Sequence, residues 1–362
     1  MADYTIANLQ FREVVRDSEN YLAEASIDIR GDFAVMVYGR YRGMVHSDDG
    51  DILCVTSRDG GATWDETPAV VMARFPRWGF TSPGVKILAD GSLLAIAHAN
   101  ERGQPGGFVF YGAYSARSTD GGQTWSAPEP LLAWPMRGIN IWDNPLELDD
   151  GTLLLAVSGA IEDANFGSSA YETSRAALLA STDAGAHWYC HGTIAYDPAH
   201  IHIFHEPGLA KTDDGRLVAL MRQHYPKVED APPGGYLFFA ESDDGGASWS
   251  PFRKTGLWGY PADLVTMHNG AILAIYGHRR DPIGIRIAVS PDGRTWQPAQ
   301  ERELLHAPLQ GVSSESLDTG YRHIGYPSAA VRDVGTILAV FHVFSEQRKQ
   351  IVLLASFTIA QG

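Results

Sequence analysis

The stretch SRDGGATW at Ser57–Trp64 recurs along the chain and decides the fold. Further copies are STDGGQTW at Ser118–Trp125, STDAGAHW at Ser181–Trp188, SDDGGASW at Ser242–Trp249 and a shorter SPDGRTW at Ser290–Trp296. The shared pattern is S-x-D-x-G-x-x-W, and the full copies follow one another at about 60 residues. A fixed period of this kind indicates an array of similar structural units.

The residue types in this motif are those of a tight hairpin turn. An Asp carboxylate accepts hydrogen bonds from nearby main-chain N–H groups, and Gly supplies positive φ angles. The Trp packs beneath the turn. We therefore expect the motif aspartates to lie on peripheral turns, so that replacing one by Ala lowers stability and leaves turnover near normal. These aspartates are Asp59, Asp120, Asp183 and Asp244.

A second repeat alternates with the first and reads as a β-hairpin: an x-Pro step, an apolar stretch, a turn usually containing Gly, and a second apolar stretch. Its copies span residues 82–98, 144–158, 206–222, 260–279 and 326–342, with a degenerate sixth copy at 21–40. Six hairpins with five turn motifs between them predict an all-β, six-bladed propeller of four strands a blade, forming one domain over residues 1–362. The last hairpin has only QIVLLASFTI after it, so we expect the N-terminal segment TIANLQFREVV to complete the last blade and close the ring.

Bulk composition excludes some classes of function. The formal net charge of −15 argues against nucleic acid as a partner, because phosphate backbones need basic surface. No apolar run approaches membrane-spanning length. The two cysteines, Cys54 and Cys190, fit no metal spacing, and no HExxH motif occurs, so we expect no metal and no cofactor. MADYTIANLQF lacks the pattern of a signal peptide, which favours the cytoplasm unless a leader was removed.

Strand direction in a propeller selects candidate site residues. The first strand of each blade lines the central channel, and the end of the second strand returns to the face where the first began. Strand-one starts give Tyr21, Ser82, Asn144, Glu206, Tyr260 and Tyr326. Strand-two ends give Arg40, His98, Ser158, Arg222, His278, Arg279 and His342, and adjacent loops add Asp143, His205, Asp263 and Arg280.

The arginines in this set point to an anionic ligand. Arg222 ends the apolar run LVALM and Arg279 follows ILAIYGH, and a guanidinium fork suits a carboxylate held by two hydrogen bonds. The alternative is an internal salt bridge, such as Arg222 with Glu206. The histidines could form a metal site or an acid–base pair, or serve as hydrogen-bonded structure, and His98 and His278 are the stronger candidates for a direct role.

The five turn motifs resemble the Asp-boxes of the sialidase (neuraminidase) superfamily over nearly the whole chain, as a divergent branch. HEPGLAKTDDGRLVALMR resembles a bacterial sialidase segment in which a Glu opens one strand and an Arg ends the next. The resemblance implies that Glu206 is the partner of the nucleophile and Arg222 the second carboxylate-binding Arg. YGHRRDPIGIRIAVSPDG implies a third Arg at Arg279 or Arg280, and GYPSAAVRDVGTILAVFH implies the nucleophile at Tyr326.

One residue that the family resemblance implies is absent from this sequence, and the position of another is undecided. The family's first Arg would fall near Tyr21, where the chain has no Arg, and FRE at Phe11–Glu13 comes too early to replace it. The acid–base Asp would fall before the first Asp-box, where Asp48, Asp49 and Asp51 all occur.

These residues predict an exo-acting glycoside hydrolase whose small-molecule substrate is an acidic or otherwise polar sugar. Tyr is the sialidase nucleophile because a neutral phenol is not repelled by a substrate carboxylate, and a nearby Glu takes the phenol proton. The alternatives are a polysaccharide lyase on uronate glycans and a non-catalytic carbohydrate-binding propeller. The sequence does not give the oligomeric state.

Overall fold

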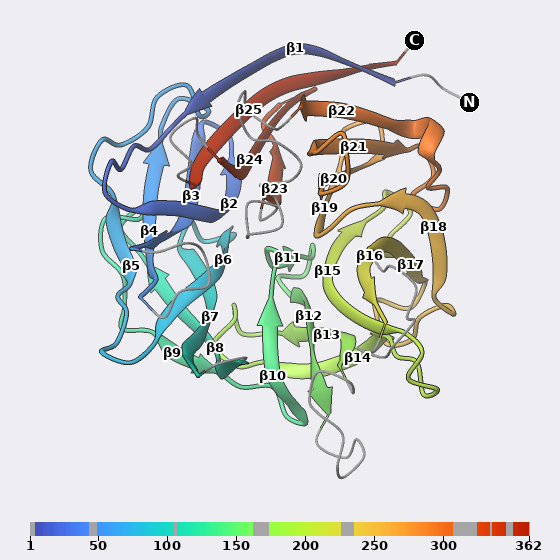
Figure 1. Cartoon of the computed structure of the whole chain (residues 1–362), viewed down its shortest axis with the longest axis horizontal. Helices are drawn as coiled ribbons and strands as arrows, with labels where there is room; N and C mark the ends of the chain where they lie inside the picture. Colours follow the sequence, from blue (N-terminus) through green and yellow to red (C-terminus); the bar gives the residue numbers. More distant parts are fainter. Residues whose placement is uncertain are drawn as a thin grey trace.

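Six β-sheets are arranged around a central axis, as Figure 1 shows in a computed structural model. The structure describes residues 4–42, 49–104, 107–161, 174–225, 235–306, 324–333, 335–344 and 350–361. The predicted six-bladed propeller is confirmed. Among the described residues, no helix has the length and apolar character that a membrane span requires.

The first three blades follow one another in chain order. Blade 1 contains β2 (Tyr21–Arg30), β3 (Phe33–Tyr41), β4 (Asp51–Ser57) and β5 (Ala69–Met72). Blade 2 contains β6 (Gly79–Ile87), β7 (Leu93–Gln104), β8 (Gly107–Ser118) and β9 (Glu129–Leu131). Blade 3 contains β10 (Met136–Ile141), β11 (Leu146–Glu147), β12 (Leu153–Ile161), β13 (Arg175–Ser181) and β14 (Tyr189–Ala195).

The other three blades complete the ring. Blade 4 contains β15 (Ile203–Lys211), β16 (Leu217–His224), β17 (Tyr236–Ser242) and β18 (Arg253–Trp258). Blade 5 contains β19 (Ala262–Thr266), β20 (Ile272–His278), β21 (Gly284–Ser290) and β22 (Glu301–His306), with the short helix η1 (Pro298–Gln300) before β22. Blade 6 contains β23 (Gly325–Val331), β24 (Thr336–Phe344), β25 (Gln350–Gln361) and the N-terminal β1 (Tyr4–Glu13).

The N-terminal strand closes the ring as predicted. β1 pairs antiparallel with β25, from Tyr4 opposite Gln361 to Glu13 opposite Leu353, and the two run side by side in Figure 1. The sheet order is β1-β25-β24-β23, so the edge of the last blade is covered by the start of the chain.

Blade 3 departs from the predicted regular hairpin. We expected its first strand to start at Asn144, but the strand begins at Met136 in β10, breaks after Ile141 and resumes briefly in β11. Both pieces pair with β12. The break leaves residues 142–145 outside the ladder, where Asp143 and Asn144 make side-chain contacts across the channel instead.

The hydrophobic core lies between the blades. Each pair of neighbouring blades shares one buried cluster; between blades 1 and 2, for example, Val35 and Val37 pack with Val85 and Ile87. The middle strands are apolar on both faces because each face covers a neighbouring blade, as in Leu153–Ala160, which is buried throughout.

The Asp-box turns have the structural role that the sequence predicts. In the first copy Asp59 accepts hydrogen bonds from the main-chain N–H and the hydroxyl of Thr63 (2.7 and 2.6 Å), and the Trp64 indole N–H donates to the Gly61 carbonyl (3.1 Å). The other copies repeat this pattern. Hydrogen bonds from Thr63 and Ser57 lower the pKa of Asp59 to about 2, which is typical of a turn carboxylate and not of a general acid.

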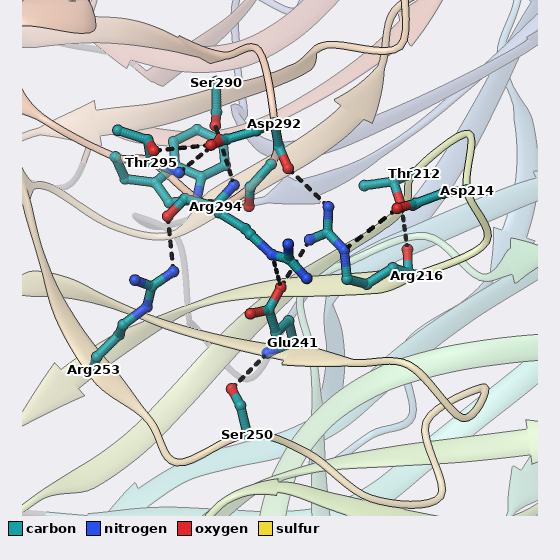
Figure 2. A network of polar contacts seen from close by, with 12 residues as sticks. Thr212, Asp214, Arg216, Glu241, Ser250, Arg253, Ser290, Asp292, Arg294 and Thr295 are labelled. Carbon is teal, nitrogen blue, oxygen red and sulfur yellow. Dashed lines mark hydrogen bonds and ion pairs between the residues drawn. The ribbon is translucent and has the colours of Figure 1, made fainter.

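Cationic side chains fasten these turns to the next blade. Figure 2 shows the fifth Asp-box, in which Arg216 of blade 4 donates to the Asp292 carbonyl (2.8 Å) and Arg253 donates to the Arg294 carbonyl (2.9 Å). Glu241 joins Arg216 and Arg294 by ion pairs of 2.9 and 2.7 Å. At the seam, Arg12 binds the carbonyls of the first Asp-box turn, so the FRE segment has a structural role.

Candidate active site

Four first strands carry the same kind of bulge at the point where they start. The ladder slips at each of these points, and one residue takes a positive φ of about 50°: Glu24 (55°), Ser82 (52°), Glu206 (49°) and Tyr326 (46°). In three of the four, a Pro follows, so the x-Pro step marks the bulge in blades 2, 4 and 6, whereas the x-Pro steps at Asn144 and Tyr260 have no positive φ. The copy in blade 1 has Ala25 there. Its first strand begins at Tyr21 as expected, but the position equivalent to Glu206 and Tyr326 is Glu24.

Tyr326 and Glu206 meet although they come from blades 6 and 4. The phenol O–H of Tyr326 donates to Glu206 Oε1 at 3.4 Å, and both residues are buried. Burial, and then the Glu206 carboxylate, raise the pKa of Tyr326 above its ordinary value. The phenol is therefore neutral and faces a carboxylate that can accept its proton, which confirms that these two side chains converge.

Two guanidinium groups lie against the same pair. Arg222 donates to Glu206 Oε1 at 2.8 Å, and its Cζ is 3.8 Å from the centroid of the Tyr260 ring. Arg279 donates from Nε to the Ile324 carbonyl (3.0 Å), and its Cζ is 5.0 Å from the centroids of Tyr260 and Tyr326. Both arginines thus make a cation–π contact with Tyr260.

Several polar atoms at this point have no hydrogen-bond partner among the described residues. They are Glu206 Oε2, Arg222 Nε and Arg279 Nη2, and all three are buried. Buried polar atoms of this kind are normally paired, so three together indicate a place for a polar ligand or water. The sequence allowed two interpretations of Arg222, an internal ion pair or an anionic ligand. The ion pair with Glu206 is present, and the Nε donor of Arg222 has no partner among the described residues.

Tyr326 is part of an aromatic stack. The sequence did not predict one member of this stack, Trp142. Trp142, in the break between β10 and β11, stacks on one side at 4.5 Å between ring centroids. His342 stacks on Tyr326 at 5.6 Å with the rings nearly parallel, and His98 lies edge-on to Trp142 at 5.6 Å. His98 and His342 were candidates from their strand-end positions, whereas Trp142 lies outside both repeats.

His205 lies opposite Arg222 in the ladder and packs against His224 at 5.4 Å. Burial and then Arg222 lower the pKa of His205 to about 3, and the same causes lower that of His224 to about 2. Both imidazoles are therefore uncharged at neutral pH.

Other predicted site residues lie in separate contacts. Arg280 is exposed, with its Cζ 4.0 Å from the Trp258 ring centroid. His278 Nδ1 lies 3.1 and 3.0 Å from the carbonyls of Arg280 and Pro282, to which it can only donate. Its contacts hold the β20–β21 loop in place.

Arg40 binds a carboxylate of its own blade. It donates to Asp51 Oδ2 at 3.0 Å, and Arg74 donates to the same oxygen at 2.8 Å. Asp51 is thus held by two guanidinium groups. Asp49 accepts the Arg42 N–H at 3.3 Å, and Asp48 lies outside the described residues.

Asp143 and Asp263 lie inside the channel. Asp143 accepts the Leu209 N–H of blade 4 (2.8 Å), and Asp263 accepts the Ala329 N–H of blade 6 (2.6 Å). The two carboxyls also hydrogen-bond each other. They line a cavity of about 250 Å³ between the later halves of the first strands, with Asp28, Lys86, Lys211 and Thr266. No group of three or more potential metal ligands is found within the part of the chain that the structure describes.

Comparison with known protein families identifies the family to which the chain belongs. Residues 89–338 match the BNR repeat-like domain family, which is more than half of the chain. No curated protein matches the sequence. The fold and the repeats therefore define a sialidase-like propeller, and the chain belongs to the BNR repeat-like domain family.

Solved structures share the whole ring. A protein of unknown function from Dyadobacter fermentans aligns with a TM-score of 0.79 and 23% identity, covering 97% of this chain and 99% of that one. The Hadza microbial sialidase Hz136 aligns at 0.68 and 18% identity, over 97% of this chain and 68% of that one. The K499G mutant of the NanB sialidase from Streptococcus pneumoniae aligns at 0.68 and 12% identity, over 96% of this chain and 70% of that one. These likenesses show a common fold.

Proposed function

We propose that this protein is an exo-acting glycoside hydrolase whose substrate is a carboxylate-bearing sugar. The observation that supports it most is the contact between the Tyr326 phenol and Glu206, beside two arginines with buried, unused donors. A tyrosine nucleophile suits such a sugar because the neutral phenol approaches without charge repulsion.

In the proposed reaction, the Tyr326 oxygen attacks the anomeric carbon while its proton passes to Glu206 Oε1. The leaving-group oxygen takes a proton from an acid of the Asp48–Asp49 segment. Water then attacks the anomeric carbon and gives a proton to the carboxylate of the Asp48–Asp49 segment, which restores the acid, while the tyrosyl oxygen leaves and takes its proton back from Glu206. Arg279 and Arg222 hold the carboxylate of the substrate through charge-assisted hydrogen bonds.

The test is Tyr326→Phe, which keeps the ring in its aromatic stack and removes the attacking oxygen. Turnover on a panel of acidic and neutral aryl glycosides should fall by at least about a hundredfold, the scale of lost proton-transfer catalysis. Binding of the acidic sugar, measured by titration calorimetry, should persist.

The matched control is Tyr189→Phe, an exposed tyrosine of β14. Normal turnover in Tyr326→Phe would contradict the proposal. A product with the ultraviolet absorbance of an unsaturated uronate would instead identify a lyase.

A further inference from the structure

A groove of about 410 Å³ opens on the surface between blades 2 and 3. It is lined by parts of β8, β9 and β10 and by the loop that joins β9 to β10. Two large apolar side chains of that loop line the groove and are mostly exposed, Leu132 (76%) and Trp134 (73%). Exposed apolar side chains gathered at a depression are typical of a binding site.

Two glycines keep the groove open. Gly112 in β8 has a φ of 103° and Gly138 in β10 has a φ of 60°, and a Cβ atom at either position would have no neighbour within 4 Å. Both glycines therefore face open space, and their positive φ angles disfavour any residue with a side chain. The groove is thus a property of the backbone and does not depend on one side-chain rotamer.

The groove combines its apolar side chains with main-chain polar groups. β9 and β10 are edge strands, because β9 pairs with β8 alone and β10 with β12 alone. The β10 ladder is also interrupted here, since its register slips between Arg137 and Asn140. Strand edges and bulges leave N–H and C=O groups that the ladder does not use. A purely apolar ligand would bury such groups without a partner, whereas a ligand with hydroxyl groups can pair with them.

A pyranose ring has the required combination of surfaces. One face of the ring carries C–H groups that pack flat on an indole, and its rim carries hydroxyl groups that donate and accept hydrogen bonds. The Trp134 ring offers the apolar face, and the two edge strands offer the hydrogen-bond partners.

A row of residues across blade 2 leads from the candidate active site to this groove. His98 lies opposite Ala113, and Ala113 lies opposite Leu131. Ala113 and Leu131 line the groove, and neighbouring strands are about 4.8 Å apart, so the groove begins one strand away from His98. The His98 ring in turn lies edge-on to Trp142, which stacks on Tyr326. The groove therefore extends outward from the candidate active site.

We propose that this groove binds the leaving-group part of an oligosaccharide whose terminal acidic sugar occupies the candidate active site. The Trp134 indole stacks on a pyranose ring of that chain, which runs outward between blades 2 and 3. This inference rests on the proposed function and narrows its substrate from any acidic glycoside to an oligosaccharide.

The experiment measures binding to Tyr326→Phe by titration calorimetry, so that no ligand is cleaved. The probes are the methyl α-glycoside of N-acetylneuraminic acid, the pentasaccharide sialyllacto-N-tetraose, and lacto-N-tetraose, which is the neutral chain alone. The pentasaccharide should bind about tenfold more tightly than the methyl glycoside, and adding Trp134→Ala should remove most of this difference. Trp134→Phe, which keeps an aromatic face, should retain most of it.

The control is Tyr189→Ala in the same Tyr326→Phe protein. Tyr189 is also an exposed aromatic residue, but it lies in β14, directly after an Asp-box turn. This variant should bind all three probes as Tyr326→Phe alone does.

The outcomes separate the two proposals. If the pentasaccharide binds no more tightly than the methyl glycoside, or if Trp134→Ala leaves the difference unchanged, the role of the groove is overturned while the proposed function stands. If the methyl glycoside does not bind but lacto-N-tetraose binds and Trp134→Ala abolishes that binding, the acidic-sugar function is overturned while the groove stands as a glycan-binding site. Binding of none of the three probes overturns both.

Discussion

The Arg222 guanidinium serves two neighbours at once. Its Nη1 donates to Glu206 and its plane lies against the Tyr260 ring. Burial lowers the pKa of Arg222, but Glu206, Tyr326 and Tyr260 together outweigh burial and raise the pKa above its ordinary value, so the group is always charged. Only a planar fork makes a hydrogen bond at its edge and a stacking contact at its face.

We therefore expect Arg222→Lys to weaken binding of N-acetylneuraminic acid by about tenfold although the charge is kept, which is the scale of one charge-assisted hydrogen bond. The control is Arg280→Lys, because Arg280 is exposed and stacks on Trp258. Titration calorimetry checks both variants. Equal affinity in Arg222→Lys and wild type would show that Arg222 serves Glu206 alone.

Whether a site residue could be predicted from the sequence depended on whether it lies in a repeat. Glu206 and Tyr326 precede a Pro at the start of a hairpin, so the pattern selects them. Glu24 has the same backbone geometry but precedes Ala25, and without the Pro the copy aligns wrongly on Tyr21. The geometry is kept without Pro because the bulge is fixed by the ladder on either side.

At the scale of elements, the broken first strand of blade 3 supplies a side chain that a regular strand would not. Because β10 and β11 leave residues 142–145 unpaired, Trp142 can lie flat on Tyr326 (4.5 Å, 27° between the rings). The strand thereby loses ladder pairing at these residues, and the Trp142 ring packs against the candidate nucleophile. No hydrophobic period marks this break, so the sequence did not predict it.

Trp142→Ala tests this use of the break. Loss of the stack should lower kcat by about tenfold, the upper end of what an aromatic pair contributes, with a smaller effect on KM. Tyr189→Ala is the matched control, because that aromatic ring is exposed and lies in β14. An effect confined to KM would show that Trp142 contacts the substrate and does not position Tyr326.

At the scale of the whole molecule, the Asp143–Asp263 pair ties four of the six blades together inside the channel. Asp143 joins blade 3 to blade 4, and Asp263 joins blade 5 to blade 6. Burial, and for Asp143 also the neighbouring Asp263, raise their pKa values, that of Asp263 to about 6. The repeats predicted the ring and its closure, but not this contact, because it joins residues 120 positions apart in different blades.

This pair predicts how stability depends on pH. A raised pKa means that the folded protein binds more protons than the unfolded chain above the ordinary Asp value of 3.8, so the free energy of unfolding falls as pH rises to about 6 and beyond. Asp263→Asn removes this titration and keeps an acceptor for the Ala329 N–H. The variant should lose less stability than wild type between about pH 5 and 7.

Urea unfolding at both pH values measures the difference. Asp28→Asn serves as the control, because it lines the same cavity and should keep the wild-type slope. A wild-type protein whose free energy of unfolding does not change across this range would contradict the raised pKa values of this pair.

The pairing of β1 with β25 has a consequence for how the protein is made on the ribosome. β1 is synthesised before blades 1 to 5, but its partner β25 follows all of them in the chain, so β1 stays unpaired while those blades are made. Blades 1 to 5 can fold as they appear, while the sixth cannot be completed until β25 has emerged. We therefore expect the nascent chain to need chaperones while β1 is exposed. The finished ring should not need them.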